Sequence, residues 1–120
     1  MEEKRKRPRW RTSFFFRNGR EYSRKYFNVI DRKTGASIGH LVDLTPEGLR
    51  ILSKSPIDRG AEFDLNIELP TAIKSQPNIA AKARCVWCEQ DINPDFFNAG
   101  FEILSISPPY VEIIEILIQE

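Results

Sequence analysis

The sequence is poor in the residues from which metal and redox centres are usually built, because its 120 residues include only two cysteines and one histidine. Two thiolates cannot complete the four-ligand shell of a structural zinc ion, and His40 lies far from them along the chain. Cys85 and Cys88 also fall in a stretch that reads as a strand, where side chains three positions apart point to opposite faces. We therefore expect no metal, no cofactor and no redox role for the pair.

Long hydrophobic runs are also missing. The longest apolar run near the N-terminus is Phe14-Phe15-Phe16, which excludes a secretory signal, and no segment approaches the roughly 20 apolar residues that span a bilayer. No nucleophile–base pair and no glycine-rich phosphate loop is recognisable. The sequence predicts a cytoplasmic protein without a membrane span, which is not an enzyme and has no catalytic residues.

The charge is divided unevenly along the chain, although the total is only +1. Residues 1–25 hold ten Lys and Arg against three Glu, a net charge of +7, and residues 26–120 carry the compensating −6. Such an asymmetry is typical of a basic arm that seeks an anion, on a mildly acidic body. A phosphate-containing partner is therefore expected.

The middle of the chain alternates between apolar and polar residues, most clearly at Glu62–Leu69. This period of two predicts half-buried strands. The expected strands are residues 26–31, 38–44, 49–52, 62–69, 79–88 and 99–106, separated by polar turns. Trp87 lies on the same strand face as Cys85 and Ala83, so we expect its side chain in the core.

The period changes after Ser107-Pro108-Pro109, where apolar residues recur at helical spacing. We expect this helix to cover an open end of a barrel, and a dimer contact remains the alternative. The predicted fold is mainly β: a small six-stranded antiparallel (split) β-barrel with one C-terminal α-helix and a basic N-terminal arm. The arm is assigned to residues 1–19 and the barrel to 20–120, while Asn18-Gly19 indicates an added hairpin around 12–24 as an alternative.

Residues 39–51 end one predicted strand, make a tight turn and begin the next. Thr45, Pro46 and Gly48 occupy the first, second and fourth positions of this turn, which fits type I. The segment resembles a strand junction of the PilZ family, whose signature is [Asp/Asn]-x-Ser-x-x-Gly, preceded by Arg-x-x-x-Arg near the N-terminus. Asp43 and Gly48 match this signature, whereas Thr45 stands at the serine, keeping the hydroxyl and adding a methyl group.

The resemblance covers most of residues 20–118. Phe63–Pro70 resembles the long central strand of the family, residues 99–102 resemble its Gly-Phe strand, and the terminal helix follows. The resemblance implies a non-catalytic receptor for cyclic di-GMP that orders its Arg-rich arm on binding and signals to an unknown protein partner. The implied ligand-binding residues are Arg20, Arg24, Asp43, Thr45 and Gly48.

The chemistry of the ligand suits these residue types. An arginine fork can meet the paired acceptors O6 and N7 of guanine or bind phosphate with two hydrogen bonds. An ionised Asp43 can accept from the N1–H and N2–H groups of guanine. Gly48 allows a close approach of the backbone, because it has no Cβ.

The choice of arginine pair stays open, because Arg-x-x-x-Arg occurs three times near the N-terminus. We prefer Arg20 and Arg24, which stand directly before the first barrel strand. If Asn18-Gly19 turns a hairpin, Arg7 and Arg11 become the better pair.

Two alternative functions remain. One is a ligand-free PilZ-like adaptor for motility or secretion machinery. The threonine at position 45, where the family signature has serine, favours it. The other is a nucleic-acid tether built on the basic arm. Nucleic acid is the weaker choice of partner, because the barrel body is acidic and lacks an aromatic-rich stacking face.

Overall fold

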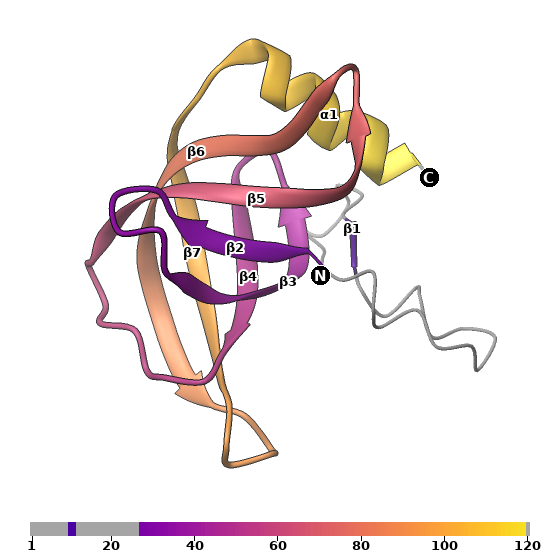
Figure 1. Cartoon of the computed structure of the whole chain (residues 1–120). Helices are drawn as coiled ribbons and strands as arrows, with labels where there is room; N and C mark the ends of the chain where they lie inside the picture. Colours follow the sequence, from indigo (N-terminus) through magenta and orange to yellow (C-terminus); the bar gives the residue numbers. More distant parts are fainter. Residues whose placement is uncertain (1–9, 12–26, 120) are drawn as a thin grey trace, which may run out of the picture.

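Figure 1 shows the computed structural model of the chain, which describes residues 10–11 and 27–119. Seven strands and one helix follow one another along these residues. They are β1 (Trp10–Arg11), β2 (Asn28–Asp31), β3 (Ser37–Thr45), β4 (Gly48–Ser53), β5 (Glu62–Ile73), β6 (Gln76–Gln90), β7 (Phe97–Ile106) and α1 (Pro108–Gln119).

Six of the strands form a closed antiparallel barrel. They pair in the order β3-β2-β5-β6-β7-β4, and β4 pairs back onto β3 to complete the ring. The short strand β1 pairs with Asp43 and Leu44 of β3, beyond the residues that pair with β2. The predicted six-stranded barrel with a C-terminal helix is thus confirmed. The alternative hairpin around 12–24 and the domain boundary at residue 20 lie outside the described residues.

The six barrel strands agree with the predicted ones except at the hairpin between β5 and β6, whereas β1 was not predicted. There both strands are longer than the alternation indicated, because Lys74 and Ser75 alone make the turn. Both residues have positive φ angles, of 52° and 67°. Turns of this kind usually contain Asn or Gly, so Lys74 and Ser75 do not indicate such a tight turn.

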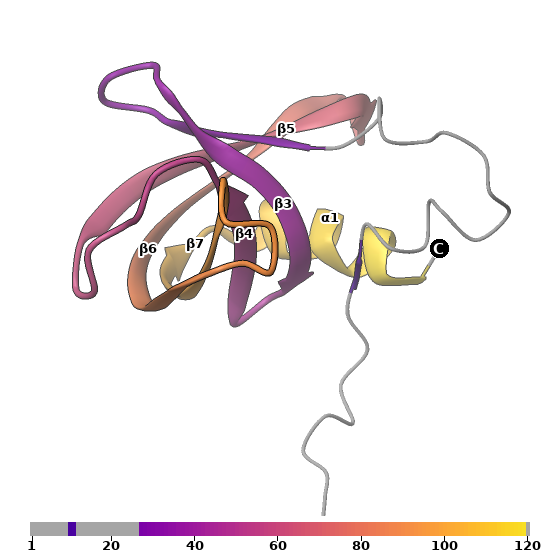
Figure 2. The same cartoon turned by 90° about the horizontal axis from the view of Figure 1, so that it is seen from below.

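The core fills the barrel with apolar side chains from every barrel strand and from the helix. Ile113, Ile114 and Leu117 of α1 are buried, and α1 contacts β3 and β6. Ser107 directly precedes the helix, and its carbonyl accepts hydrogen bonds from the amides of Tyr110 and Val111. The helix lies across one end of the barrel, as expected (Figures 1 and 2). The opposite end carries the long β6–β7 hairpin.

Candidate functional site

A β-bulge in β3 turns Asp43 to the outside of the barrel. Leu41 pairs with Ile51 and Asp43 pairs with Arg50, so Val42 is the additional residue. Leu41 is fully buried in the core, and without the bulge Asp43 would point inward beside it. The extra residue instead places the carboxylate next to the side chain of Arg50 on the outer face.

A second bulge, at Val86 in β6, does the same for Trp87. Cys85 pairs with Phe101 and Trp87 pairs with Gly100, which again leaves one residue over. The side chain of Trp87 is 37% exposed, so the prediction that it lies in the core is wrong. That prediction assumed unbroken alternation, and one inserted residue exchanges the two faces of a strand.

The same bulge brings the two cysteines to one side of the strand. The amide of Ile57 lies 3.4 Å from Cys88 Sγ, and its carbonyl oxygen lies 3.9 Å from Cys85 Sγ. The expectation that the thiols face opposite sides is therefore wrong. Burial raises the pKa of the Cys85 thiol, and the neighbouring Cys88 adds to this effect. A buried, protonated thiol is a poor nucleophile and a poor metal ligand.

The two bulges align four residues in one row across the outer face. Asp43 pairs with Arg50, Arg50 with Gly100, and Gly100 with Trp87, so the row crosses β3, β4, β7 and β6. Arg50 Nε donates to Asp43 Oδ2 at 2.9 Å, and Arg50 Nη1 lies 3.5 Å from Asn98 Oδ1. Because the Asp43 side chain is only 8% exposed, this ion pair compensates much of the carboxylate's desolvation.

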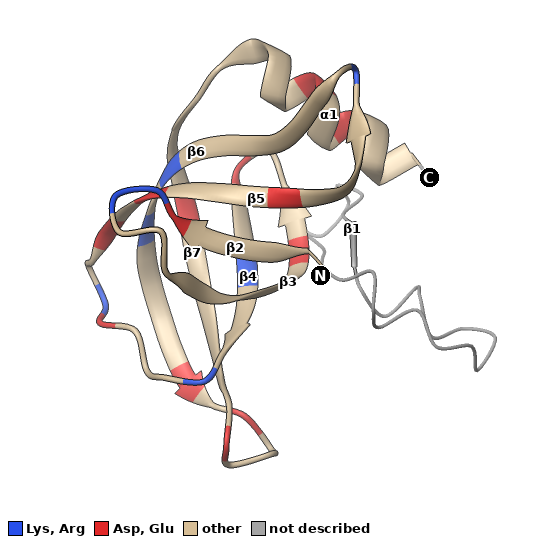
Figure 3. Ribbon diagram, in the orientation of Figure 1, with Lys and Arg blue, Asp and Glu red and all other residues tan. Residues whose placement is uncertain are grey.

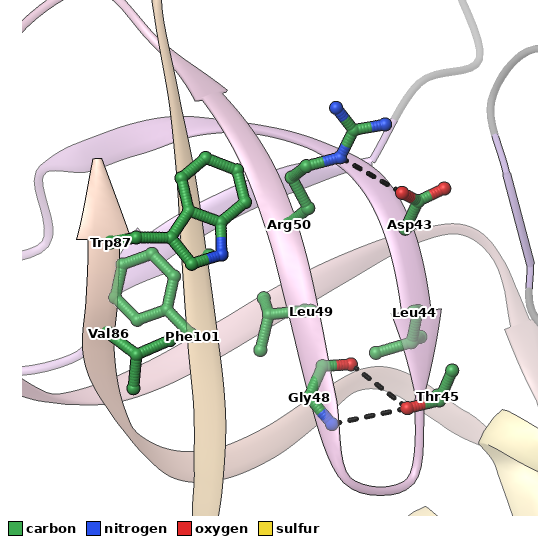
Figure 4. A pocket seen from close by; sticks show the side chains of 10 residues that line it. Asp43, Leu44, Thr45, Gly48, Leu49, Arg50, Val86, Trp87 and Phe101 are labelled. Carbon is green, nitrogen blue, oxygen red and sulfur yellow. Dashed lines mark hydrogen bonds and ion pairs between the residues drawn. The ribbon is translucent and has the colours of Figure 1, made fainter. Parts of the chain in front are cut away.

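Gly100 makes room for the indole ring of Trp87. A Cβ atom at Gly100 would overlap Nε1, Cε2 and Cζ2 of that ring. The indole therefore lies across β7 against the glycine backbone, pointing toward β4 (Figure 4). A glycine within a strand often marks such a close approach.

This row lines an open cleft of about 440 Å³ on the outer face of the barrel (Figure 4). The cleft brings together Asp43, Thr45 and Gly48, which the sequence predicted as site residues. Three of the other lining residues were not predicted as site residues: Arg50, Val86 and Trp87. Cleft formation depends on the register of four strands, and the motif at residues 43–48 reports on only two of them.

Thr45 and Gly48 form the corner of the cleft, at the β3–β4 hairpin. Thr45 Oγ1 accepts hydrogen bonds from the amides of Glu47 and Gly48, each at 3.2 Å, and donates to the carbonyl of Gly48 at 3.4 Å. The hydroxyl thus supports the turn itself. A Cβ at Gly48 would lie 2.6 Å from the carbonyl oxygen of Phe101, so the close approach that glycine allows here is between β4 and β7.

Of the four candidate arginines, only Arg11 lies within the described residues. Its backbone stands opposite Asp43 in the pairing of β1 with β3. Arg7, Arg20 and Arg24 lie outside the described residues. The described part of the chain holds no cluster of three or more His, Cys, Asp or Glu side chains that could bind a metal ion. None of its helices is long and apolar enough to cross a membrane.

The model of the PilZ domain family matches residues 3–120. The chain belongs to the PilZ family. No curated protein sequence matches it.

Two solved structures show the same fold. One is the Bacillus subtilis inhibitor of motility (MotI/DgrA), with a TM-score of 0.71 and 11% sequence identity. The alignment covers 98% of this chain and 50% of that protein, so the chain spans about half the length of this structural relative. The other is the PilZ domain of YcgR from Escherichia coli with c-di-GMP, with a TM-score of 0.63 and 15% identity, covering 97% and 90% of the two chains.

Proposed function

We propose that this PilZ domain is a non-catalytic, cytoplasmic receptor for cyclic di-GMP and that the ligand binds in the cleft along the row Asp43–Arg50–Gly100–Trp87. Family membership supports this assignment, together with the structural similarity to a PilZ domain that holds this nucleotide. The observation that carries the proposal is the row itself, in which an acceptor, a guanidinium and an exposed indole face one cleft.

Each member of the row has a distinct task in the proposed complex. The indole of Trp87 offers a flat surface on which a guanine can stack. Arg50 supplies fork donors for the guanine edge or for a phosphate, and Asp43 supplies the acceptor for guanine N1–H and N2–H. Asp43 also holds Arg50 in place through its Nε, which leaves less rotamer freedom to lose on binding.

The basic N-terminal arm completes the proposed site from above the cleft. The register position of Arg11 opposite Asp43 supports the pair Arg7 and Arg11. The spacing of Arg20 and Arg24 from the barrel supports the other pair. In either case the arm would become ordered over the nucleotide on binding, which couples ligand binding to a change of surface.

Isothermal titration with cyclic di-GMP tests the proposal, with GTP as the control for general phosphate affinity. We expect Asp43→Ala to abolish binding. Trp87→Leu should weaken the affinity about tenfold, which is in the lower part of the range for losing the stacking of one base. Lys82→Ala, also on the outer face of β6 but away from the cleft, should bind like the wild type. A silent titration with folded protein would reject the receptor function.

The same titration identifies the arginine pair. Arg7→Ala with Arg11→Ala and Arg20→Ala with Arg24→Ala are compared as two double variants. The double variant that lacks the pair in use should lose binding. The other double variant should bind only slightly more weakly, because of its lower net positive charge. Equal, small losses in both would contradict a specific arginine clamp.

A ligand-free adaptor is the second candidate, and the hydrogen bonds of Thr45 favour it. Its hydroxyl already uses one donor and two acceptor sites within the turn, which is its full capacity. A phosphate would have to displace the 3.4 Å bond to the carbonyl of Gly48, which is the weakest of the three. If Thr45→Ser binds cyclic di-GMP and the wild type does not, the adaptor function is the correct one.

A further inference from the structure

The tip of the β6–β7 hairpin, residues 91–96, presents an apolar side chain far from the core. Ile92 is 100% exposed there, and Pro94 beside it is also exposed. The tip projects from the end of the barrel opposite α1 (Figures 1 and 2). A single exposed apolar residue is common on protein surfaces, so Ile92 alone would carry no argument.

Hydrogen bonds within the tip restrain the backbone that carries this side chain. Asp91 Oδ1 accepts from Asn98 Nδ2 at 2.6 Å, and Asp91 Oδ2 accepts from the amide of Asn93 at 3.2 Å. Asn93 Oδ1 accepts from the amide of Asp95 at 3.0 Å, and Gln90 Nε2 donates to the carbonyl of Pro94 at 2.9 Å. A loop tied in this way loses little conformational entropy on binding, which favours a docking role.

The charged residues of the tip, and of the end of β6 that leads into it, are all acidic. They are Glu89 near the end of β6 and Asp91 and Asp95 in the tip. The neighbouring edge is basic, with Lys54 after Ser53, which pairs with Phe97, and with Arg50 at 3.5 Å from Asn98. Figure 3 shows acidic positions and no basic ones at the tip itself. An acidic rim around an apolar anchor fits a basic, apolar surface and opposes binding to anionic lipid headgroups.

We propose that the β6–β7 tip docks a protein partner by inserting Ile92 into an apolar cleft rimmed by Lys and Arg side chains. No residue of the tip lines the nucleotide cleft. The proposal therefore goes beyond the receptor function and can fail without it.

Site-specific photo-crosslinking in the native bacterial host tests the docking. A benzophenone side chain at position 92 is compared with one at the exposed Thr71, on the β5–β6 hairpin near α1. We expect one prominent protein adduct at position 92 that is absent at position 71. Equal adducts at both positions, no adduct at 92, or an adduct with a second copy of this chain would overturn the proposal.

Affinity measurements with the purified adduct protein complete the test. Ile92→Ser should weaken binding about tenfold or more, as for an anchor residue, while Ile92→Leu binds almost normally. Leu104→Ser, a half-exposed apolar residue elsewhere on the surface, is the matched control and should have no effect. Asp95→Lys should weaken binding most at low salt. Wild-type affinity in Ile92→Ser would refute the anchor role.

Discussion

Two neighbouring rows on the outer face of the barrel are built from similar residues but have opposite characters. The row Asp43–Arg50–Gly100–Trp87 lines a cleft. One step along the strands, Glu62, Arg84 and Glu102 pair across β5, β6 and β7. There Arg84 Nε donates to Glu102 Oε2 at 2.8 Å, and each of these two side chains is 42% exposed. The first row lines a cleft because two bulges and a glycine determine how its side chains lie. The second row is a solvent-exposed ion-pair ladder.

Backbone irregularity, more than residue type, distinguishes the row that lines a cleft from the row that does not. Both rows contain an arginine and a carboxylate at hydrogen-bonding distance. Only the first row has bulges that turn an aromatic ring and a carboxylate outward beside a residue without a side chain. β-Bulges are indeed common next to functional sites, because they re-aim side chains.

The largest effect on the free energy of unfolding is expected from adding a methyl group at Gly48, where β4 meets β7. Gly48→Ala places its Cβ against the carbonyl oxygen of Phe101, which cannot move without shifting the backbone. We expect the free energy of unfolding to fall by about 1–3 kcal/mol. Urea denaturation followed by circular dichroism measures it. A variant as stable as the wild type would show that the two strands can separate at little cost.

A smaller effect is expected from the same change at Gly100, because its obstacle is a side chain. The indole of Trp87 can swing away, so Gly100→Ala should lower the free energy of unfolding by about 1 kcal/mol. In a Trp87→Ala background the same change should be neutral or slightly stabilising, since glycine is the less favourable strand residue. A double-mutant cycle measures this coupling, and additive effects would mean that ring and glycine are independent.

The fold and part of the cleft could be predicted from the sequence. Alternation gave the strands, because one face of each is buried, and the turn chemistry at residues 45–48 located the corner. The prediction for Trp87 was wrong because the bulge at Val86 cannot be recognised from composition. A bulge nevertheless exchanges the strand faces of all residues that follow it. Arg50 was overlooked because its ion pair with Asp43 exists only in the shifted register. Pairings between distant strands are decided by tertiary packing, which local patterns do not contain.

The ion-pair ladder should contribute little to stability, in contrast to the glycine positions. Arg84→Gln breaks its bonds to Glu102 and the 4.0 Å pair with Glu62. Since all three side chains are partly exposed, we expect a loss of only about 0.2–1 kcal/mol at low salt. The loss should nearly vanish in about 1 M salt, where the Debye length is about 3 Å. Unchanged binding of cyclic di-GMP is also expected, because Arg84 does not line the cleft.

The smallest effect concerns the pKa of Asp91. Hydrogen bonds connect this residue to the first row, because Asn98 bonds both to Asp91 and to Arg50. The side-chain amide of Asn98 holds the pKa of the Asp91 carboxyl below its ordinary value, and the amide of Asn93 adds to this. A lowered pKa in the folded state means that these bonds stabilise the tip above the ordinary pKa of aspartate and are lost as the pH falls through the lowered one.

Carbon-detected NMR titration of the Asp91 carboxyl measures this pKa directly. In Asn98→Ala the pKa should rise toward its ordinary value, and amide exchange at Asn93 should accelerate, because the tip has lost its strongest tie. Lys82→Ala, which is far from the tip on the same strand as Gln90, should leave the titration unchanged. If Asn98→Ala titrates like the wild type, Asn98 does not hold the tip, and the rigid presentation of Ile92 must rest on the backbone bonds between Asp91 and Phe96.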